Sequence, residues 1–241
     1  MKVSEKINQK IAEMPVGMVF KYQQLGISND EYRAAAKAIE RLIAGKIIKR
    51  IAVGVFYKPK KTVFGELKPG EEERLRPYLF AGENRIAYIT GTALYNRMGL
   101  TTQVPGDIRV ASKLKEIRTR IGNINVRRVK SYVDVTDENY HLLEILDVLK
   151  DFKLIPDLNK KTAVKRMMTV LASLKKEDLL QIVRCGIDYP PRVRAFLGVL
   201  LENISADMDL EQLAQSLNPL TMYDLGITPD ILPTAGKWNI R

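Results

Sequence analysis

Cysteine and histidine are almost absent from this sequence, which has one residue of each. Cys185 has no second thiol for an intramolecular disulfide, as is typical of proteins from a reducing compartment. His141 stands between Tyr140 and Leu142 at a helical position, without the positioned partners that catalysis requires. One cysteine and one histidine cannot supply a structural zinc site within one chain. We therefore expect neither a metal site nor a catalytic residue of these types.

Long apolar runs and the common catalytic motifs are missing as well. No uninterrupted apolar stretch approaches the ~18 residues of a membrane span. The N-terminal sequence MKVSEKINQKIAEM is charged and amphipathic, unlike a secretory signal. The sequence holds no P-loop, HExxH, GxSxG or strand-associated GxGxxG pattern. We predict a cytoplasmic protein that is not an enzyme, has no cofactor and has no membrane partner.

Acidic residues are missing from the stretch between Glu40 and Glu66, where seven Lys or Arg occur. The net charge of the whole chain is +11 at pH 7. Residues 1–65 hold 13 Lys/Arg against 5 Asp/Glu, and residues 113–130 hold seven Lys/Arg against Glu116 alone. A solvated surface usually mixes both signs of charge, whereas an excess of Lys and Arg favours polyanions, because bound phosphates release counterions. Both basic zones are therefore candidates for nucleic-acid contact.

The N-terminal third predicts a series of short elements. Residues 4–14 place apolar side chains at i, i+4 and i+7, which predicts an amphipathic helix with Ser4 as its N-cap. PVGMVF predicts a short strand, and KYQQLGI predicts a short helix that ends at Gly26. Ser28 and Glu31 form the pattern of a capping box at the start of a second long helix. The β-prone runs KIIKRI and VFYK then predict a hairpin with its turn at 52–54.

The order helix, strand, helix, helix and hairpin is typical of a winged helix-turn-helix, which we assign to residues 1–63. Residues 64–84 are rich in Gly, Pro and Glu and predict a connector with a helix at 71–80. The remainder, 85–241, predicts a helix in AYITGTALYNRMGL and strands in GDIRVAS and NINVRRVKSYVDV. Helical periodicity then predicts helices at 137–150, 160–173, 176–185, 190–204 and 209–217, followed by a packed, turn-rich tail. The fold class is α+β and mostly helical: a winged helix-turn-helix followed by a larger mixed domain with a helical C-terminal half.

The first basic zone suggests how duplex DNA would be contacted. A helix fits the major groove, its first turn reaches base edges, and flanking cations bind phosphates. The predicted contacts on the second long helix are Ser28, Asn29, Tyr32, Arg33 and Lys37. The predicted wing cations are Lys49, Arg50, Lys58, Lys60 and Lys61. The short turn between the two strands predicts a wing that grips the DNA backbone without reading bases.

The second basic zone has three interpretations. Its cations are Lys113, Lys115, Arg118, Arg120, Arg127, Arg128 and Lys130. They form a second phosphate-binding surface, a site for an acidic protein partner, or a solvated strand-loop-strand face.

Several segments resemble a known group of proteins. GKIIKRIAVGVFYKP, followed by AYITGTALYNRMGLTTQVPGDIRVAS, resembles the AbiEi-type antitoxins of bacterial abortive-infection toxin–antitoxin systems, which act in phage defence. YPPRVRAFLGVLLENI and the closing LNPLTMYDLGI and LPTAGKWNI resemble a branch of that group described only as a domain of unknown function. The resemblance implies that residues 28–61 bind the operator of the protein's own operon. It also implies that the segment from Ala87 onward neutralises a nucleotidyltransferase-like toxin encoded next to it.

We therefore expect a DNA-binding transcriptional autoregulator that acts as an antitoxin. One alternative is an RNA-binding accessory protein without catalysis, although Phe56 and Tyr57 are the only aromatic pair in either basic zone and base stacking usually needs more. Another is a nucleotidyltransferase that uses Asp207 and Asp209. That pair lacks the adjacent strand and Gly-Ser turn of a two-metal site, and an Asp there most simply caps a helix.

Overall fold

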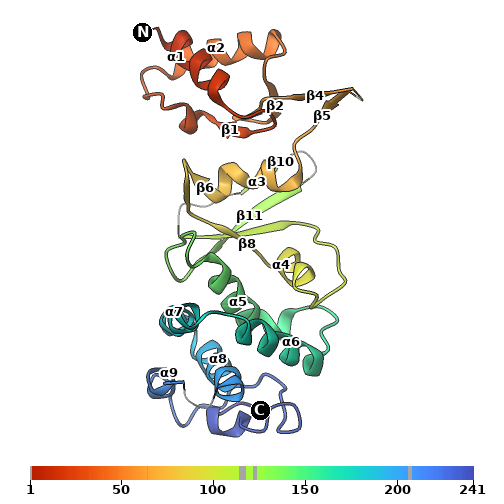
Figure 1. Ribbon diagram of the computed structural model, residues 1–241, viewed down its shortest axis with the longest axis vertical. Helices are drawn as coiled ribbons and strands as arrows, with labels where there is room; N and C mark the ends of the chain where they lie inside the picture. The colour runs from red at the N-terminus through yellow and green to blue at the C-terminus, as the bar shows by residue number, and fades with distance from the viewer. Residues whose placement is uncertain (1, 64, 114–117, 122–123, 206–207) are drawn as a thin grey trace. The chain divides into compact units, whose positions relative to one another are not determined.

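The computed structural model describes residues 2–63, 65–113, 118–121, 124–205 and 208–241. The chain forms two compact units (Figure 1). Unit 1 comprises Met1–Ile86 and Arg118–Val126, and unit 2 comprises Ala87–Ile117 and Arg127–Arg241. Both contain helices and strands, and helices dominate the C-terminal half, so the predicted mixed α+β class is confirmed. Within the described ranges, no helix combines the length and the hydropathy of a bilayer-spanning segment.

Unit 1 begins with the predicted order of elements. These are α1 (Val3–Glu13), β1 (Val19–Lys21), a 3-10 helix (Tyr22–Leu25), α2 (Tyr32–Ala44), β2 (Lys49–Ala52) and β3 (Val55–Tyr57). Strand β3 lies between β1 and β2 and is antiparallel to both. The apolar stripes of α1 and α2 bury Ile7, Ile11, Ala35, Ile39 and Leu42 in one core with Phe20 and Phe56. Burial of these stripes fixes which face of each helix meets solvent.

Both predicted N-caps differ from the structure. Helix α1 begins at Val3, so Ser4 lies inside its first turn. Helix α2 begins at Tyr32, because the Ser28 hydroxyl donates to the Glu31 carboxylate at 2.9 Å instead of accepting a backbone N–H. Only the reciprocal half of the capping box forms, in which the Ser28 N–H donates to Glu31 at 3.1 Å. Residues 28–31 are therefore a turn that precedes the helix.

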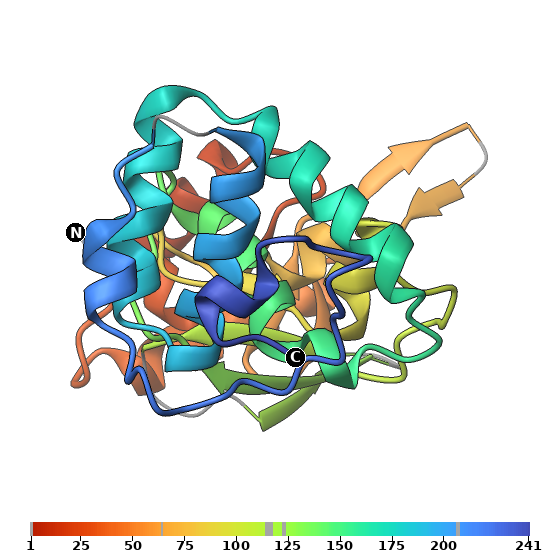
Figure 2. The ribbon, with the colours of Figure 1, turned by 90° about the horizontal axis from the view of Figure 1, so that it is seen from below.

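The segment predicted as a connector is part of unit 1. It forms β5 (Gly65–Leu67), which pairs with β4 (Lys60–Thr62), then α3 (Glu71–Leu79), β6 (Phe80–Ala81) and β7 (Asn84–Arg85). The helix agrees with the predicted 71–80. Lys21 of β1 places its ammonium 3.2 Å from the ring centre of Tyr78 in α3, and burial lowers the pKa of Lys21 to about 8. Figures 1 and 2 show the β4–β5 hairpin projecting from the rest of its unit.

Unit 1 also takes in part of the predicted C-terminal domain. Strand β10 (Arg118–Ile121) and the first three residues of β11 (Ile124–Lys130) belong to it. These residues were expected within 85–241. Unit 1 is therefore built from two segments that are separated in the sequence. Charge and composition along the sequence do not predict that the second segment joins the first.

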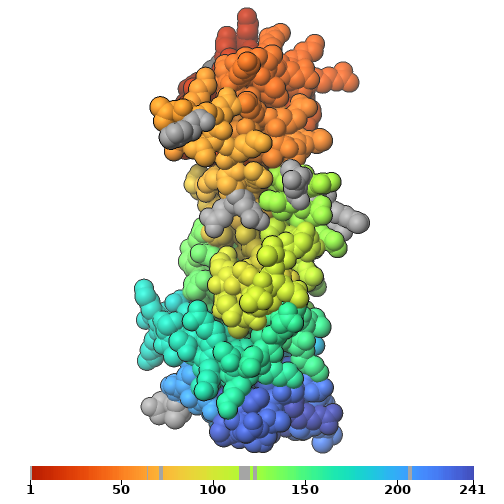
Figure 3. Space-filling view, turned by 90° about the vertical axis from the view of Figure 1, so that its right-hand side faces the viewer, coloured from red at the N-terminus to blue at the C-terminus, as the bar shows by residue number. Residues whose placement is uncertain are grey.

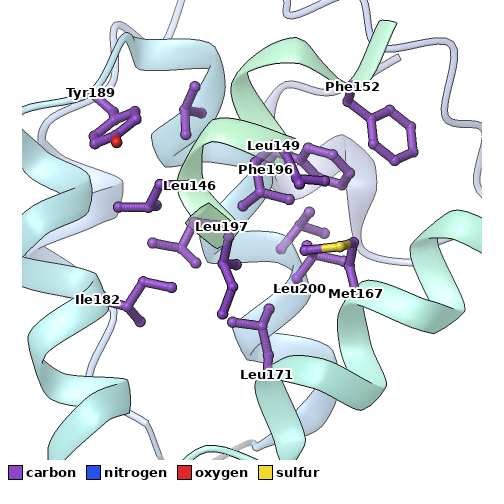
Figure 4. Close-up of a cluster of buried hydrophobic side chains, with 14 of the residues drawn as sticks. Leu146, Leu149, Phe152, Met167, Leu171, Ile182, Tyr189, Phe196, Leu197 and Leu200 are labelled. Atoms are coloured by element: carbon purple, nitrogen blue, oxygen red, sulfur yellow. The ribbon is translucent and has the colours of Figure 1, made fainter. Parts of the chain in front are cut away.

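Unit 2 contains a small sheet and a helical body. In the sheet, β9 (Ile108–Ser112) lies between β8 (Tyr88–Thr90) and β11. The helices are α4 (Thr92–Arg97), α5 (Tyr140–Asp151), α6 (Lys160–Ala172), α7 (Lys176–Ile187), α8 (Pro191–Ile204) and α9 (Glu211–Gln215). The five helices predicted after residue 137 are all present. Figure 4 shows Leu146, Ile182 and Leu197 pointing toward one another from α5, α7 and α8.

The segment AYITGTALYNRMGL was predicted as one helix, but its first part is strand β8. The hydroxyls of Tyr88 and Thr90 donate to the buried carboxylate of Asp147 at 3.0 and 2.8 Å. Lys150 donates to the other carboxylate oxygen at 2.6 Å. Alternate residues of a strand share a face, which lets Tyr88 and Thr90 reach one acceptor on α5. Burial raises the pKa of Asp147, against the opposing effects of Lys150 and the two hydroxyls.

The turn-rich tail packs onto the helices of unit 2, as predicted. Its side chains Leu225, Ile227, Leu232, Trp238 and Ile240 are buried. The indole N–H of Trp238 donates to Glu202 of α8 at 2.8 Å, and the ring lies directly against Gly198 of the same helix. In Figure 3 the tail, in dark blue, forms a continuous surface with the helical part of the unit.

The contact between Gly198 and Trp238 predicts that no side chain larger than that of glycine fits at position 198 without a shift. A methyl group on Gly198 would meet the indole ring at 2.1 Å. We expect Gly198→Ala to lower the free energy of unfolding by about 1–3 kcal/mol, as overpacking does, despite the better helix propensity of alanine. Gly236→Ala is the matched control, because a methyl group there meets nothing within 4 Å. Equal thermal midpoints for the two variants would contradict this account of how the tail is held.

Candidate nucleic-acid interface

The exposed face of α2 carries a row of cations. Arg33, Lys37 and Arg41 follow one another at i, i+4 and i+8, and all three side chains are exposed. They lie on the face opposite the buried stripe of the helix, so their exposure follows from that burial. Among the described residues, the ion pairs closer than 4 Å do not include any of the three. The row is therefore available to an anionic partner.

The residues at the start of α2 are exposed but partly constrained. Ser28 is engaged with Glu31, whereas Asn29 is exposed in the turn. Tyr32 is 50% exposed, and its ring lies 4.9 Å from the ring of Tyr22. This contact places the Tyr32 side chain against the 3-10 helix and leaves half of it exposed. Asn29 and Tyr32 thus remain surface groups beside Arg33.

The β2–β3 hairpin supplies two of the predicted wing cations. Lys49 is half-buried and forms an ion pair with Glu66 of β5. Arg50 is exposed, with its guanidinium carbon 5.7 Å from the ring centre of Phe56. The turn at residues 53 and 54 is tight, as predicted, and leaves Val53 98% exposed at its tip.

Lys58 binds the C-terminal end of α1. Its ammonium donates to the carbonyl oxygens of Ile11, Ala12 and Met14 at 3.1, 2.9 and 2.9 Å. These carbonyls lie at the C-terminal end of α1, where helix carbonyls lack intrahelical partners and carry partial negative charge. Lys58 was predicted as a wing cation, but this geometry makes it the cap of α1.

Lys60 and Lys61 lie on a different hairpin from the predicted wing. Both are exposed on β4, whose partner is β5. Lys61 stands directly opposite Glu66, and Lys60 stands opposite Leu67. Because successive residues of a strand point to opposite faces of the sheet, the two lysines lie on opposite faces of this hairpin.

The second basic zone divides between the units. Arg120 is exposed in unit 1, and Arg118 is the first residue of β10 in the same unit. In unit 2, Lys113 pairs with Asp134 at 3.1 Å, Arg127 pairs with Asp107 at 3.0 Å, and Arg128 donates to the Ser112 carbonyl at 3.0 Å. Lys130 is exposed, and Lys115 lies outside the described residues. Three of these cations are thus bound by neighbours in their own unit.

The exposed cations of unit 1 outside the predicted contacts include Arg41 and Lys46. Arg41 continues the row of Arg33 and Lys37, and the i, i+4 spacing in the sequence would have identified it. Lys46 follows the end of α2 with a positive φ of 56°, which no sequence pattern indicates for a lysine.

The other candidate residues show ordinary packing. Cys185 is buried, and His141 lies 3.7 Å from Asp178 on the surface. Asp209 accepts the backbone N–H of Glu211 at 3.0 Å at the start of α9, and Asp207 lies outside the described residues. Across the described ranges, no three His, Cys, Asp or Glu side chains are grouped so as to hold a metal ion.

Comparisons with known proteins give one family and a solved structure. The model of a family of unknown function, DUF6088, matches residues 6–139. No curated protein matches the sequence. Among solved structures, the crystal structure of the RV2827C protein from Mycobacterium tuberculosis is similar at 12% identity, with a TM-score of 0.43. The similarity covers 92% of this chain and 84% of that chain.

The position of Lys58 predicts an effect on stability. We expect Lys58→Met to lower the free energy of unfolding of unit 1 by about 1–2 kcal/mol, because three helix carbonyls lose a charged donor. Lys60→Met removes an exposed charge two residues away and should leave the stability unchanged. Chemical denaturation of the two variants measures the difference, and equal midpoints would show that Lys58 does not act as a cap.

Proposed function

We propose that the chain, which belongs to DUF6088, a family of unknown function, is a cytoplasmic DNA-binding transcriptional regulator that contacts duplex DNA through unit 1. The observation that carries the proposal is the division of charge. Unit 1 has 19 Lys/Arg against 10 Asp/Glu, a net of +9, whereas unit 2 has 20 against 18, a net of +2. Such a concentration of positive charge favours a polyanion and gives its binding a steep salt dependence.

The topology of unit 1 supports duplex DNA as the polyanion. The order α1, β1, 3-10 helix, α2, β2, β3, with sheet order β1-β3-β2, is consistent with the winged helix-turn-helix that we propose for this part of unit 1. In helix-turn-helix proteins the second helix of the motif enters the major groove. Here that helix is α2, which presents Arg33, Lys37 and Arg41, with Asn29 and Tyr32 at its start. Arg and Asn are the side chains best suited to guanine and adenine edges.

The wider role follows from the sequence resemblance. The resemblance to AbiEi-type antitoxins implies that the DNA bound by unit 1 is the operator of the protein's own operon. It also implies that unit 2 neutralises a nucleotidyltransferase-like toxin encoded beside it. We therefore propose an autoregulating antitoxin of a two-gene system, in which the near-neutral unit 2 contacts the toxin and the basic unit 1 contacts DNA.

The DNA-binding proposal predicts a specific loss. We expect the double variant Arg33→Ala, Lys37→Ala to bind its own upstream DNA at least about tenfold more weakly, with a salt slope smaller by about two. Lys165→Ala, an exposed lysine of α6, is the control and should bind as the wild type does. Mobility-shift titrations at several salt concentrations make the measurement. Binding unaffected by the double variant would reject α2 as the reading helix, and preference for structured RNA in competition would favour an RNA-binding function instead.

The antitoxin proposal predicts that the two activities separate. We expect co-expression of the wild-type chain to restore growth of cells that express the adjacent gene product. The Arg33→Ala, Lys37→Ala variant should restore growth equally when transcribed from a foreign promoter, because its changes leave unit 2 intact. Growth curves under matched expression test both statements, and a wild-type chain that gives no protection would refute the antitoxin role.

A further inference from the structure

The carboxylate of Glu66 is surrounded by lysines. It forms an ion pair with Lys49 of β2, and Lys61 stands directly opposite it on β4. Lys46, just after α2, is also close enough to act on its charge, and the three cations hold the pKa of Glu66 below its usual range. In the sequence, Glu66 is the only acidic residue between Glu40 and Glu71. Strands β2 and β4 thus each place a lysine next to one anion, and Lys46 adds positive charge nearby.

The backbone conformation of Lys46 is unusual for a lysine. Its φ is 56°, in the left-handed region that favours glycine, while the preceding Gly45 has an ordinary φ of −74°. The Lys46 N–H donates to the Ile43 carbonyl at 3.0 Å and closes the end of α2. A glycine would make the same bond without strain. Because glycine would fit this position with less strain, the presence of a lysine here is consistent with a role for its side chain.

We infer that Lys46, Lys49 and Lys61 form a binding site for a backbone phosphate of nucleic acid, and that the Glu66 carboxylate occupies this site in the free protein. The inference rests on the proposed DNA-binding function and adds a contact site beyond α2. Carboxylate and phosphate oxygens accept the same charge-assisted hydrogen bonds from ammonium groups. A DNA phosphate replaces one anion by another, so none of the three lysines loses its counter-charge when Glu66 is displaced.

Replacing Glu66 by a phosphate would also keep the β4–β5 hairpin linked to β2. A two-stranded hairpin is at best marginally stable by itself. In the β4–β5 hairpin, Lys60 and Lys61 of β4, Leu67 of β5 and Val63 between the two strands are exposed. The pair between Glu66 and Lys49 links this hairpin to β2. A phosphate that binds Lys49 of β2 and Lys61 of β4 makes the same link from outside. The projecting hairpin therefore keeps its anchor when DNA is bound.

Removing the internal anion tests the inference. We expect Glu66→Gln to bind upstream DNA about two- to fivefold more tightly than the wild type, because a surface ion pair of this kind no longer competes. The salt slope should be steeper by about one. Glu13→Gln is the matched control: it makes the same charge change at a carboxylate that accepts from Gln9 within α1. It should bind as the wild type does.

Lys46→Gly separates the site from the fold. The thermal midpoint should stay the same or rise, because glycine adopts the left-handed conformation without strain. DNA affinity should fall about threefold, and the salt slope should be smaller by about one. Unchanged affinity with unchanged stability would remove Lys46 from the site.

The outcomes are distinguishable from failure of the proposed function. A wild-type protein that shows no salt-sensitive binding at all would refute DNA binding itself. Wild-type binding, with Glu66→Gln equal to Glu13→Gln or weaker than the wild type, would overturn only the phosphate site. Tighter binding by Glu66→Gln together with weaker binding by Lys46→Gly would establish it.

Discussion

Unit 1 has nine more positive than negative charges, and its stability depends on contacts of several lysines with carbonyl oxygens and an aromatic ring in addition to carboxylates. Like charges in a small volume repel and oppose the compact state. Lys58 binds three carbonyls of α1, Lys6 binds the Gly26 carbonyl at 2.7 Å, and Lys21 lies over the Tyr78 ring. Carbonyls and aromatic faces attract a cation without cancelling its charge. These lysines therefore connect the elements of unit 1, and the unit still keeps its net positive charge.

The cations of α2 are exposed for a different reason. Like charges at i, i+4 destabilise a helix by only about 0.2–0.5 kcal/mol a pair. Burying one Leu or Ile side chain contributes about 1.5–3 kcal/mol. The buried stripe of Ala35, Ile39 and Leu42 consequently decides how α2 is rotated, and the row from Arg33 to Arg41 must face solvent. The core fixes the geometry of the candidate interface, and electrostatics alone would not.

The sequence predicted those features that depend on local periodicity. The helices between residues 140 and 204 follow apolar patterns within one element, and so does the buried face of α2. The missed features depend on contacts between distant residues. Two hydroxyls of strand β8 donate to Asp147, almost sixty positions later in the sequence. The ammonium of Lys58 binds carbonyl oxygens at the end of α1. Charge counting placed Lys58 among the exposed cations because it carries no information about which lysine finds an internal acceptor.

The two units treat charge in opposite ways. Among its described residues, unit 2 buries one carboxylate, that of Asp147. Two hydroxyls and Lys150 donate hydrogen bonds to it, so its negative charge is compensated inside the unit. Unit 1, in contrast, has exposed cations on its surface, such as Arg33, Lys37 and Arg41 of α2. At physiological salt a charge is screened over about 8 Å, so a partner senses the few groups nearest to it and not the net charge of the chain. The +11 of the sequence is therefore less informative than the local arrangement, in which one carboxylate, Glu66, stands among three lysines and changes what an approaching phosphate meets.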